Sequence, residues 1–338
     1  MRSVREINTI LVTGDLGFIG HYLTCRLVRS DYNVVGIDIN PNMNSPESYH
    51  QVVGSILDPK AVLQAMKGVD CVIHLAAEHK DFGISKEKYF QVNKEGTKTL
   101  LSCAAELNVR KFIFFSSVAV YGDQQGTTED TGPKPTSYYG ASKLAAEVEI
   151  RDWMDQDPTR QAIIIRPTVV FGPQNHANVF RLIKHLCDRK FMWVGRGENI
   201  KSVAYVENLV DATLFLLKKM ETGLHIFNYS DEPHMTTQQM VDLIARKAGV
   251  EVSRLRIPLG PALLIARIFD ILGSVLNHDF PLTSARIRRF DAPTRHTAEK
   301  IREWGFKPLY SLEDGFEKTV NWYISHADRQ MSYSVTSD

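Results

Sequence analysis

Tyr139 and Lys143 stand four residues apart in the segment YYGASK, so on a helix both side chains lie on one face. Tyr138 would point about 100° away from that face. A phenol has a pKa near ~10 and is a poor base at neutral pH, but an adjacent ammonium favours the phenolate. The spacing therefore predicts that Tyr139 could accept a proton from a sugar or alcohol hydroxyl. An ordinary surface pair on a helix would show the same spacing.

Two serines precede this pair in the segment FFSSVAVYG, where an apolar strand is expected to end. A hydroxyl of Ser116 or Ser117 at the carboxyl end of a strand can hydrogen-bond the same reacting oxygen as the tyrosine. The segment therefore supplies a second candidate group for proton transfer.

A glycine-rich turn occurs much earlier, in the segment ILVTGDLGFIG. Gly14, Gly17 and Gly20 close an apolar strand and open a helix that begins with Phe18 and Ile19. Glycines at these positions permit a tight turn and let a pyrophosphate approach the backbone, where the helix N-terminus attracts negative charge. The pattern predicts a dinucleotide site, although a glycine-rich turn without a ligand would have the same composition.

Asp38 ends the next strand, in the segment VVGIDIN. A carboxylate at this distance from the glycine turn typically meets the 2′-hydroxyl of the adenosine ribose. The same carboxylate would repel a 2′-phosphate, so the sequence favours NAD over NADP as the cofactor.

The elements that must position these residues alternate between short β-branched runs and helical patterns. This alternation predicts an α/β fold with a Rossmann-type doubly wound parallel sheet and a smaller C-terminal α/β substrate lobe. Helices are expected from Phe18, near 59–67, near 86–107, from Tyr139 to Gln156, and at 176–190, 207–220 and 236–248. We expect an NAD-binding domain over 1–172 with a return to the sheet within 199–230, a substrate-binding lobe over 173–326 and a flexible tail over 327–338.

The composition sets broad limits on partners and compartment. The 338 residues include 40 basic and 39 acidic ones, so the net charge of +1 gives no reason to expect a nucleic-acid partner. The N-terminus lacks the apolar core of a signal peptide, so we expect the mature chain to begin at or near Met1 and to be cytoplasmic. Four widely spaced cysteines without metal-ligand spacing are expected to be reduced, and no metal site is expected: Cys25, Cys71, Cys103 and Cys187.

Taken in order, seven segments resemble the extended short-chain dehydrogenase/reductase family, in its NAD-dependent nucleotide-sugar epimerase and dehydratase branch. They are TGDLGFIG, HLAAEH, VNKEGT, FSSVAVYGD, YYGASK, IIRPTVVFGP and KSVAYVENLVDA. The resemblance implies that Ser117, Tyr139 and Lys143 form the catalytic set. Ser117 is preferred to Ser116 because the family's hydroxyl residue stands four positions before the tyrosine of VYG, here Tyr121.

The resemblance also implies further residues around the cofactor. Asn93 would brace the site and Arg166 would lie structurally behind it, while Tyr139 and Lys143 would contact the cofactor as well as the substrate. The remaining implied cofactor contacts follow the third and fourth strands: Ser55, Ile56, Leu75, Ala76 and Ala77.

Four positions depart from the family pattern. Dehydratases of this branch carry an Asp-Glu pair directly after the catalytic hydroxyl residue, and here those positions are Val118 and Ala119. Dehydration is therefore not expected. Ser55 replaces an Asp of the adenine-binding segment, which weakens one expected contact. Val169 replaces an Asn, so a polar contact near the nicotinamide is missing.

A subgroup of the family is indicated by HLAAEHKD, VGRGENIKSVAYVENLV and the C-terminal FDILGSVL with SARIRRF. These segments resemble 4-epimerases that act on N-acetylglucosamine attached to UDP or polyprenyl diphosphate, including those of O-antigen and lipopolysaccharide synthesis. In that interpretation Lys201 and Asn178 contact the diphosphate and His79 lies beside the sugar. A solvated loop lysine and a packing or capping histidine are the alternatives.

The apolar stretch 261–276 is too short to span a bilayer and carries Arg267 and Asp270. With the basic segment 286–289 it could form an amphipathic helix at an anionic membrane surface, where a lipid-linked substrate would be found. A core helix of the small lobe and a contact in a homodimer, which the resemblance implies, are the alternatives.

Other activities share parts of this pattern. A 4-keto-sugar reductase would use NADPH, against which Asp38 argues, and hydroxysteroid dehydrogenases share the tyrosine and lysine. A dinucleotide-sensing regulator without catalysis would not need Tyr139 or Lys143, and both are present.

Overall fold

The structure is a computed structural model that describes residues 7–41, 49–80, 83–253, 255–276 and 283–334. Contacts divide the chain into two compact units. The first unit comprises Met1–Thr168, Val206–Ser230 and His296–Leu309. The second unit comprises Val169–Tyr205, Asp231–Arg295 and Tyr310–Asp338.

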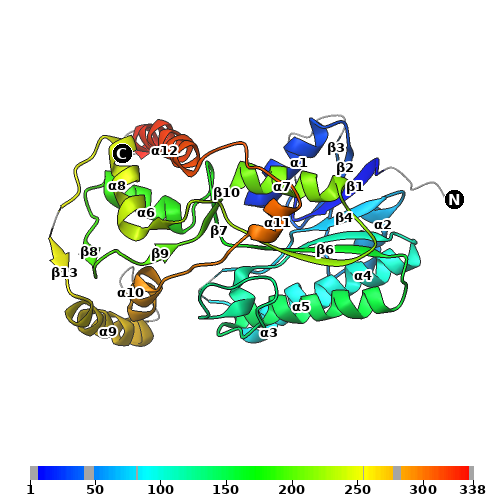
Figure 1. The fold of residues 1–338 in the computed structure, drawn as a ribbon, viewed down its shortest axis with the longest axis horizontal. Coiled ribbons are helices and arrows are strands. Elements are labelled where there is room, and N and C mark those ends of the chain that lie inside the picture. The colour runs from blue at the N-terminus through cyan, green and yellow to red at the C-terminus, as the bar shows by residue number, and fades with distance from the viewer. Residues whose placement is uncertain (1–6, 42–48, 81–82, 254, 277–282, 335–338) are drawn as a thin grey trace. The chain divides into compact units, whose positions relative to one another are not determined.

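Seven parallel strands form the sheet of the first unit, in the order β11-β6-β5-β4-β1-β2-β3 (Figure 1). Every residue of β4 is buried, and so are four of the five in β1 and β5, as expected when helices cover both faces. The strands are β1 (Thr9–Thr13), β2 (Asn33–Asp38), β3 (Tyr49–Val53), β4 (Cys71–His74), β5 (Lys111–Phe115), β6 (Gln161–Pro167) and β11 (Gly223–Tyr229).

The helices of the first unit lie in two layers, one on each face of the sheet (Figure 1). Helices α1 (Phe18–Val28) and α7 (Val206–Lys218) contact each other in one layer. The other layer contains α2 (Pro59–Met66), α4 (Gly96–Glu106) and α5 (Tyr138–Asp155), and the short α11 (Glu299–Glu303) contacts β11. The predicted Rossmann-type doubly wound sheet is therefore confirmed. The chain reverses its winding between β1 and β4, where folds of this kind bind their ligands.

One predicted helix, near 86–107, consists of three segments. These are α3 (Lys86–Phe90), a π-helical turn η1 (Gln91–Glu95) and α4. π-helical turns are rare and occur frequently at functional sites. Here the turn contains the buried Asn93, so the irregular segment coincides with a residue that we expected near the cofactor.

The second unit is built from short strand pairs and helices. Its strands pair as β7 (Val169–Phe171) with β10 (Val203–Tyr205), β8 (Trp193–Val194) with β13 (Arg256–Ile257), and β9 (Ile200–Lys201) with β12 (Met235–Thr236). Its helices are α6 (Asn178–Cys187), α8 (Thr237–Ala248), α9 (Leu259–Leu276), α10 (Ser284–Asp291) and α12 (Leu312–Ser334). The rings of Phe171 and Phe316 stack in its interior with centroids 4.3 Å apart. Helices α6 and α8 lie where the periodicity predicts them.

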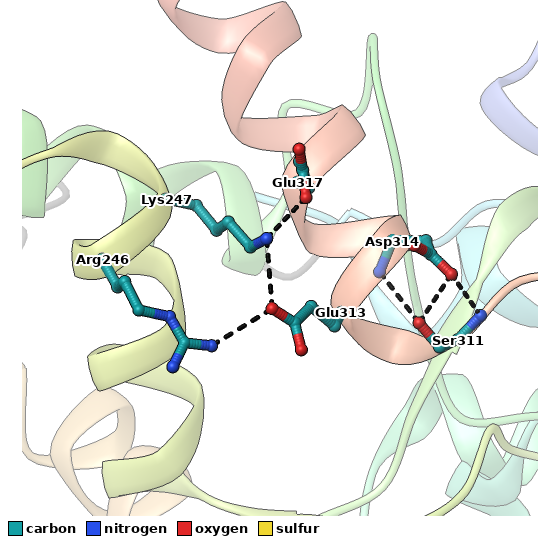
Figure 2. A network of polar contacts seen from close by, with 6 residues as sticks. All are labelled: Arg246, Lys247, Ser311, Glu313, Asp314 and Glu317. Atoms are coloured by element: carbon teal, nitrogen blue, oxygen red, sulfur yellow. Dashed lines mark hydrogen bonds and ion pairs between the residues drawn. The ribbon is translucent and has the colours of Figure 1, made fainter.

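Helices α8 and α12 pack together and are also joined by surface ion pairs (Figure 2). Lys247 Nζ lies 2.5 Å from Glu317 Oε2 and 3.1 Å from Glu313 Oε1, and Arg246 Nη2 lies 3.2 Å from the same Glu313 oxygen. Exposed pairs of this kind contribute little, about 0–1 kcal/mol each, so apolar packing between the helices matters more.

Helix α12 continues to Ser334, so its last turns fall within 327–338, for which the polar composition predicts a flexible tail. Residues 335–338 of that predicted tail lie outside the described residues. The apolar stretch 261–276 lies within helix α9, and no helix in the described ranges is long and apolar enough to cross a membrane. All four cysteines are free thiols, as expected.

Candidate active site

Tyr139 and Lys143 lie in the first two turns of helix α5, as their spacing predicts. The helix begins after Ser137, whose hydroxyl accepts a hydrogen bond from the Gly140 amide at 3.0 Å. A side chain at Gly140 would place its Cβ 2.3 Å from the Ala119 carbonyl oxygen. The glycine therefore allows the start of α5 to approach the segment that follows strand β5, where the candidate serines lie.

Lys143 is buried, with 2% of its surface exposed. Its ammonium donates a hydrogen bond of 2.7 Å to the Phe115 carbonyl oxygen and lies 4.6 Å from the centroid of the Phe114 ring. Burial lowers the pKa of Lys143 to about 7, against the opposing effect of the Glu147 carboxylate. The lysine can therefore change its charge near neutral pH, which an exposed lysine cannot.

The two tyrosines of the segment have different environments. Tyr139 is half-buried and its ring lies 6.3 Å from the Tyr89 ring, between centroids. Tyr138 is 58% exposed, and Lys86 Nζ lies 5.9 Å from its ring centroid. The structure therefore places Tyr139 on the same face as Lys143 and directs Tyr138 outward.

The two serines at the end of β5 also differ. Ser116 is buried and its hydroxyl donates to Glu147 Oε1 at 2.6 Å. Ser117 is half-buried, and its hydroxyl accepts from the Ala119 amide at 3.1 Å as the cap of the turn η2 (Val118–Tyr121). A capping hydroxyl that accepts one backbone bond keeps its proton available for donation to an oxygen.

The glycine loop fits a dinucleotide. Gly14 has φ = 68°, and a Cβ there would lie 2.8 Å from the backbone of Ala76. A Cβ at Gly20 would lie 2.1 Å from the Gly14 carbonyl oxygen. Helix α1 begins at Phe18 after Gly17, with no side-chain cap and no acidic residue in its first turn. Such a helix N-terminus suits the diphosphate of NAD.

Asp38 ends strand β2 next to β1, and its Oδ1 accepts a hydrogen bond of 2.9 Å from the Asn40 amide. A second carboxylate, Asp15, lies inside the glycine loop and was missed by the motif analysis. It is buried, and the Tyr49 hydroxyl donates to its Oδ2. Burial and the charge of Asp38 raise the pKa of Asp15, despite the hydrogen bonds that oppose this. Two acidic groups in this region favour a ribose without a 2′-phosphate.

The other expected cofactor residues follow β3 and β4. The Ser55 hydroxyl accepts from the Leu57 amide at 3.2 Å, and Ile56 is buried against Gly96. The amides of Leu75 and Ala76, which precede Ala77, donate to Thr13 Oγ1 at 3.2 Å and 3.1 Å. Both segments therefore have a fixed backbone at the carboxyl edge of the sheet.

Asn93 joins three parts of this edge. Its Oδ1 accepts from the Glu78 amide at 2.7 Å, and its Nδ2 donates to the Glu78 carbonyl and to Ser142 Oγ, the latter at 2.9 Å. Since Ser142 directly precedes Lys143, the π-helical turn holds the loop after β4 to helix α5.

The candidate substrate residues are more dispersed. His79 is exposed after β4, with its backbone amide bonded to the Glu78 side chain at 3.2 Å. Asn178 and Lys201 belong to the second unit, where Asn178 is the exposed first residue of α6. Lys201 Nζ donates to the Ala292 carbonyl oxygen at 2.5 Å. Burial lowers the pKa of Lys201 to about 8, opposed by Asp291.

A cavity of about 550 Å³ lies within the second unit and was not foreseen. It is lined by residues 195–199, residues 256–259 and Asp291. The lining contains Arg196 and Arg256 together with the carboxylates of Glu198 and Asp291, and the Arg256 guanidinium lies 4.8 Å from the ring centroid of Trp193. Its walls come from segments far apart in sequence, so no single motif indicates it.

Comparison with known proteins places the chain in a family. The model of the NAD dependent epimerase/dehydratase family matches residues 10–229. The chain is 34% identical over 324 residues to N-acetyl-alpha-D-glucosaminyl-diphospho-ditrans,octacis-undecaprenol 4-epimerase of Escherichia coli O157:H7, covering 95% of this chain and 97% of that protein. It is 28% identical to the decarboxylating sterol-4-alpha-carboxylate 3-dehydrogenase of Mus musculus, covering 94% and 91% of the two chains.

A solved structure shows the same fold. The UDP-glucose 4-epimerase of Thermotoga maritima, crystallised with UDP-glucose, superposes with a TM-score of 0.75 at 22% identity, covering 94% of this chain and 99% of that one. The predicted resemblance is confirmed: the chain belongs to the NAD-dependent epimerase/dehydratase family and uses NAD as its cofactor.

Proposed function

We propose that this enzyme is a 4-epimerase that interconverts N-acetylglucosamine and N-acetylgalactosamine on a diphosphate carrier, for the synthesis of a surface polysaccharide. The observation that carries the proposal is the placement of Tyr139 and Lys143 on one face of α5, against the strand end that presents Ser117. The identity of 34% with an epimerase named for such a substrate supports this choice of sugar.

In the proposed mechanism Tyr139 accepts the proton of the sugar 4-hydroxyl, and Ser117 donates a hydrogen bond to the same oxygen. The ammonium of Lys143 stabilises the tyrosinate electrostatically. The glycine loop and Asp38 would hold NAD, which would supply the hydride acceptor for carbon 4. For inversion the 4-keto sugar would turn over in the site, and Tyr139 would return the proton to the oxygen when carbon 4 is reduced on its opposite face.

Two neighbouring activities fit less well. Dehydration needs an acid and a base beside the 4-keto sugar, and the positions after Ser117 are the apolar Val118 and Ala119. A reductase that consumes NADPH would have to place a 2′-phosphate near Asp38 and Asp15. A sterol dehydrogenase remains the second candidate, because a mammalian enzyme of that name is 28% identical over most of the chain.

The main experiment supplies N-acetylglucosamine on UDP and on undecaprenyl diphosphate separately and follows inversion at carbon 4 by NMR. We expect inversion on at least one carrier without added cofactor, because NAD is regenerated in each cycle and stays bound. Tyr139→Phe removes only the hydroxyl, so it should lower kcat by a factor of about 10² or more while the protein still binds NAD. Near-normal turnover by this variant, or turnover only with stoichiometric NADPH, would contradict the proposal, as would binding of a sterol without sugar affinity.

Lys201, Asn178 and His79 are the proposed substrate contacts, with Lys201 and Asn178 on the diphosphate. The half-buried Lys201 carries the stronger argument, since a diphosphate would stabilise an ammonium whose pKa partial burial has lowered. For His79, which is exposed, the only argument is its position in the segment after β4.

Lys201→Met should raise KM for either carrier by about tenfold or more, with a smaller effect on kcat, because the diphosphate is bound in both ground state and transition state. Lys190→Met, at an exposed lysine of the same unit, is the matched control and should leave KM unchanged. Equal KM values for wild type and the Lys201 variant would remove the residue from the substrate site.

We further propose that helix α9 meets the membrane surface when the carrier is a polyprenyl lipid. Leu264 and Ile268 are 65% and 57% exposed on this helix, and Arg267 beside them is exposed too. The opposite side packs through the buried Ala262 and Ala266. An apolar face with an adjacent cation is the pattern of a helix that lies in a membrane interface. Leu259, at the start of α9, lines the cavity of the second unit.

Leu264→Gln/Ile268→Gln should weaken sedimentation with vesicles that contain anionic lipid and raise KM for the undecaprenyl substrate alone. Leu309→Gln, which alters an equally exposed leucine of the first unit, controls for surface hydrophobicity. Unchanged vesicle binding in the double variant would assign the α9 face to protein contacts.

The resemblance to the family also implies a homodimer formed through two helices of each subunit. Sedimentation velocity of the purified protein should give twice the mass of one chain. A monomer at the concentration of the activity assay would exclude a dimer as the active form.

A further inference from the structure

Glu147 is a fully buried carboxylate that the mechanism above does not use. It lies one helical turn after Lys143 on α5, so its side chain is on the lysine's face of the helix. Burying a charge without partners is costly, so its contacts indicate what it is for.

The first contact joins Glu147 to the strand that presents Ser117. Its Oε1 accepts the Ser116 hydroxyl at 2.6 Å, while Lys143 donates to the carbonyl of the preceding residue, Phe115, at 2.7 Å. Two successive turns of α5 therefore hold two successive residues at the carboxyl end of β5. Ser117 is the next residue along the chain.

The second contact fixes the carboxylate itself. Arg166 on β6 donates from Nε to Oε1 at 2.9 Å and from Nη2 to Oε2 at 2.6 Å. The same guanidinium donates to the Tyr121 hydroxyl at 2.7 Å, which in turn donates to Asn228 Oδ1 at 2.8 Å. A bidentate pair whose guanidinium is itself hydrogen-bonded to Tyr121 fixes the position of the Glu147 carboxylate.

The surroundings of Lys143 show why the charge matters. Burial pulls the pKa of the lysine down to about 7, and the Glu147 carboxylate acts in the opposite direction. His74 on β4 offers no negative charge, because burial and the nearby ammonium hold its pKa well below the usual value. It is hydrogen-bonded to Thr13 and Thr97. Tyr139, on α5 itself, is the group whose proton Lys143 would influence in the proposed mechanism, and Arg166 is a cation.

We propose that Glu147 is a positioning residue whose carboxylate, held by Arg166, favours the charged form of Lys143 and fixes the strand end that carries Ser117. Without that carboxylate less of Lys143 would be in the ammonium form that stabilises a tyrosinate. The part played by Lys143 in catalysis rests on the proposed function, whereas the effect of Glu147 on Lys143 is a property of the protein alone.

The test measures that property directly. Protein labelled with carbon-13 at the lysine Cε is titrated by NMR from about pH 5 to 10, a range that spans the lowered lysine pKa. The Lys143 signal is assigned by its loss in Lys143→Met. Glu147→Gln, which keeps the shape and removes the charge, should lower the titration midpoint of Lys143 by about one pH unit or more. Tyr121→Phe, the matched control, removes another hydrogen bond from Arg166 without changing any charge and should leave the midpoint in place.

Two further variants cover the case in which Glu147→Gln does not fold, since it leaves Arg166 unpaired. Glu147→Leu/Arg166→Met removes both charges, a replacement that is often neutral for buried pairs, and should also lower the midpoint. Glu147→Asp keeps the charge and should restore a midpoint above that of Glu147→Gln. A Lys143 midpoint that is the same in wild type and in the charge-removing variants would overturn the proposal, whatever substrate the enzyme uses.

Activity supplies a second readout once the substrate is known. If the alkaline limb of kcat reports loss of the Lys143 proton, Glu147→Gln should move that limb to lower pH. A purely structural glutamate would lower kcat or stability equally at all pH values, so an unshifted limb would also contradict the proposal.

Discussion

The approach of helix α5 to the carboxyl end of strand β5 is the constraint on which the candidate site depends. Gly140 permits it, since any side chain would meet the Ala119 carbonyl, and Lys143 maintains it through the Phe115 carbonyl. The approach brings the tyrosine, the lysine and the serine to one place at the carboxyl edge. It also removes the lysine from water, so the same contact that builds the site lowers the pKa of its cation.

Much of this arrangement follows from local sequence. The apolar strands are marked by continuous β-branched runs, the glycine turn by its residue type, and the pair Tyr139 and Lys143 by the helical period, and the structure has all three where the pattern predicts. The family resemblance adds the order of the motifs. Asp15 lies within the glycine turn but belongs to no motif of its own. Its burial depends on Tyr49, which lies 34 residues further along the chain.

Other features could not be read from local patterns. Glu147 and Arg166 stand 19 residues apart on a helix and a strand, and only the packing of α5 on the sheet makes them a pair. The π-helical turn places the Asn93 side chain where it forms hydrogen bonds with Glu78 and Ser142. The helix propensities of the residues do not indicate these bonds. The cavity of the second unit combines residues near 197 with residues near 257 and Asp291. In each case the decisive contact is long-range, whereas periodicity reports only neighbours along one element.

Two adjoining features of the second unit bear on the choice of carrier: its cavity and the exposed face of helix α9. The lining of the cavity contains two arginines and two carboxylates, so their formal charges cancel and the cavity does not distinguish the carriers. Helix α9 starts at the wall of that cavity with Leu259 and then exposes Leu264 and Ile268, which a nucleotide would not need. A polyprenyl diphosphate carries a long apolar chain that a nucleotide lacks, so an exposed apolar face suits the lipid carrier. The cavity by itself is compatible with either carrier, so the exposed face of α9 is the feature that favours a lipid.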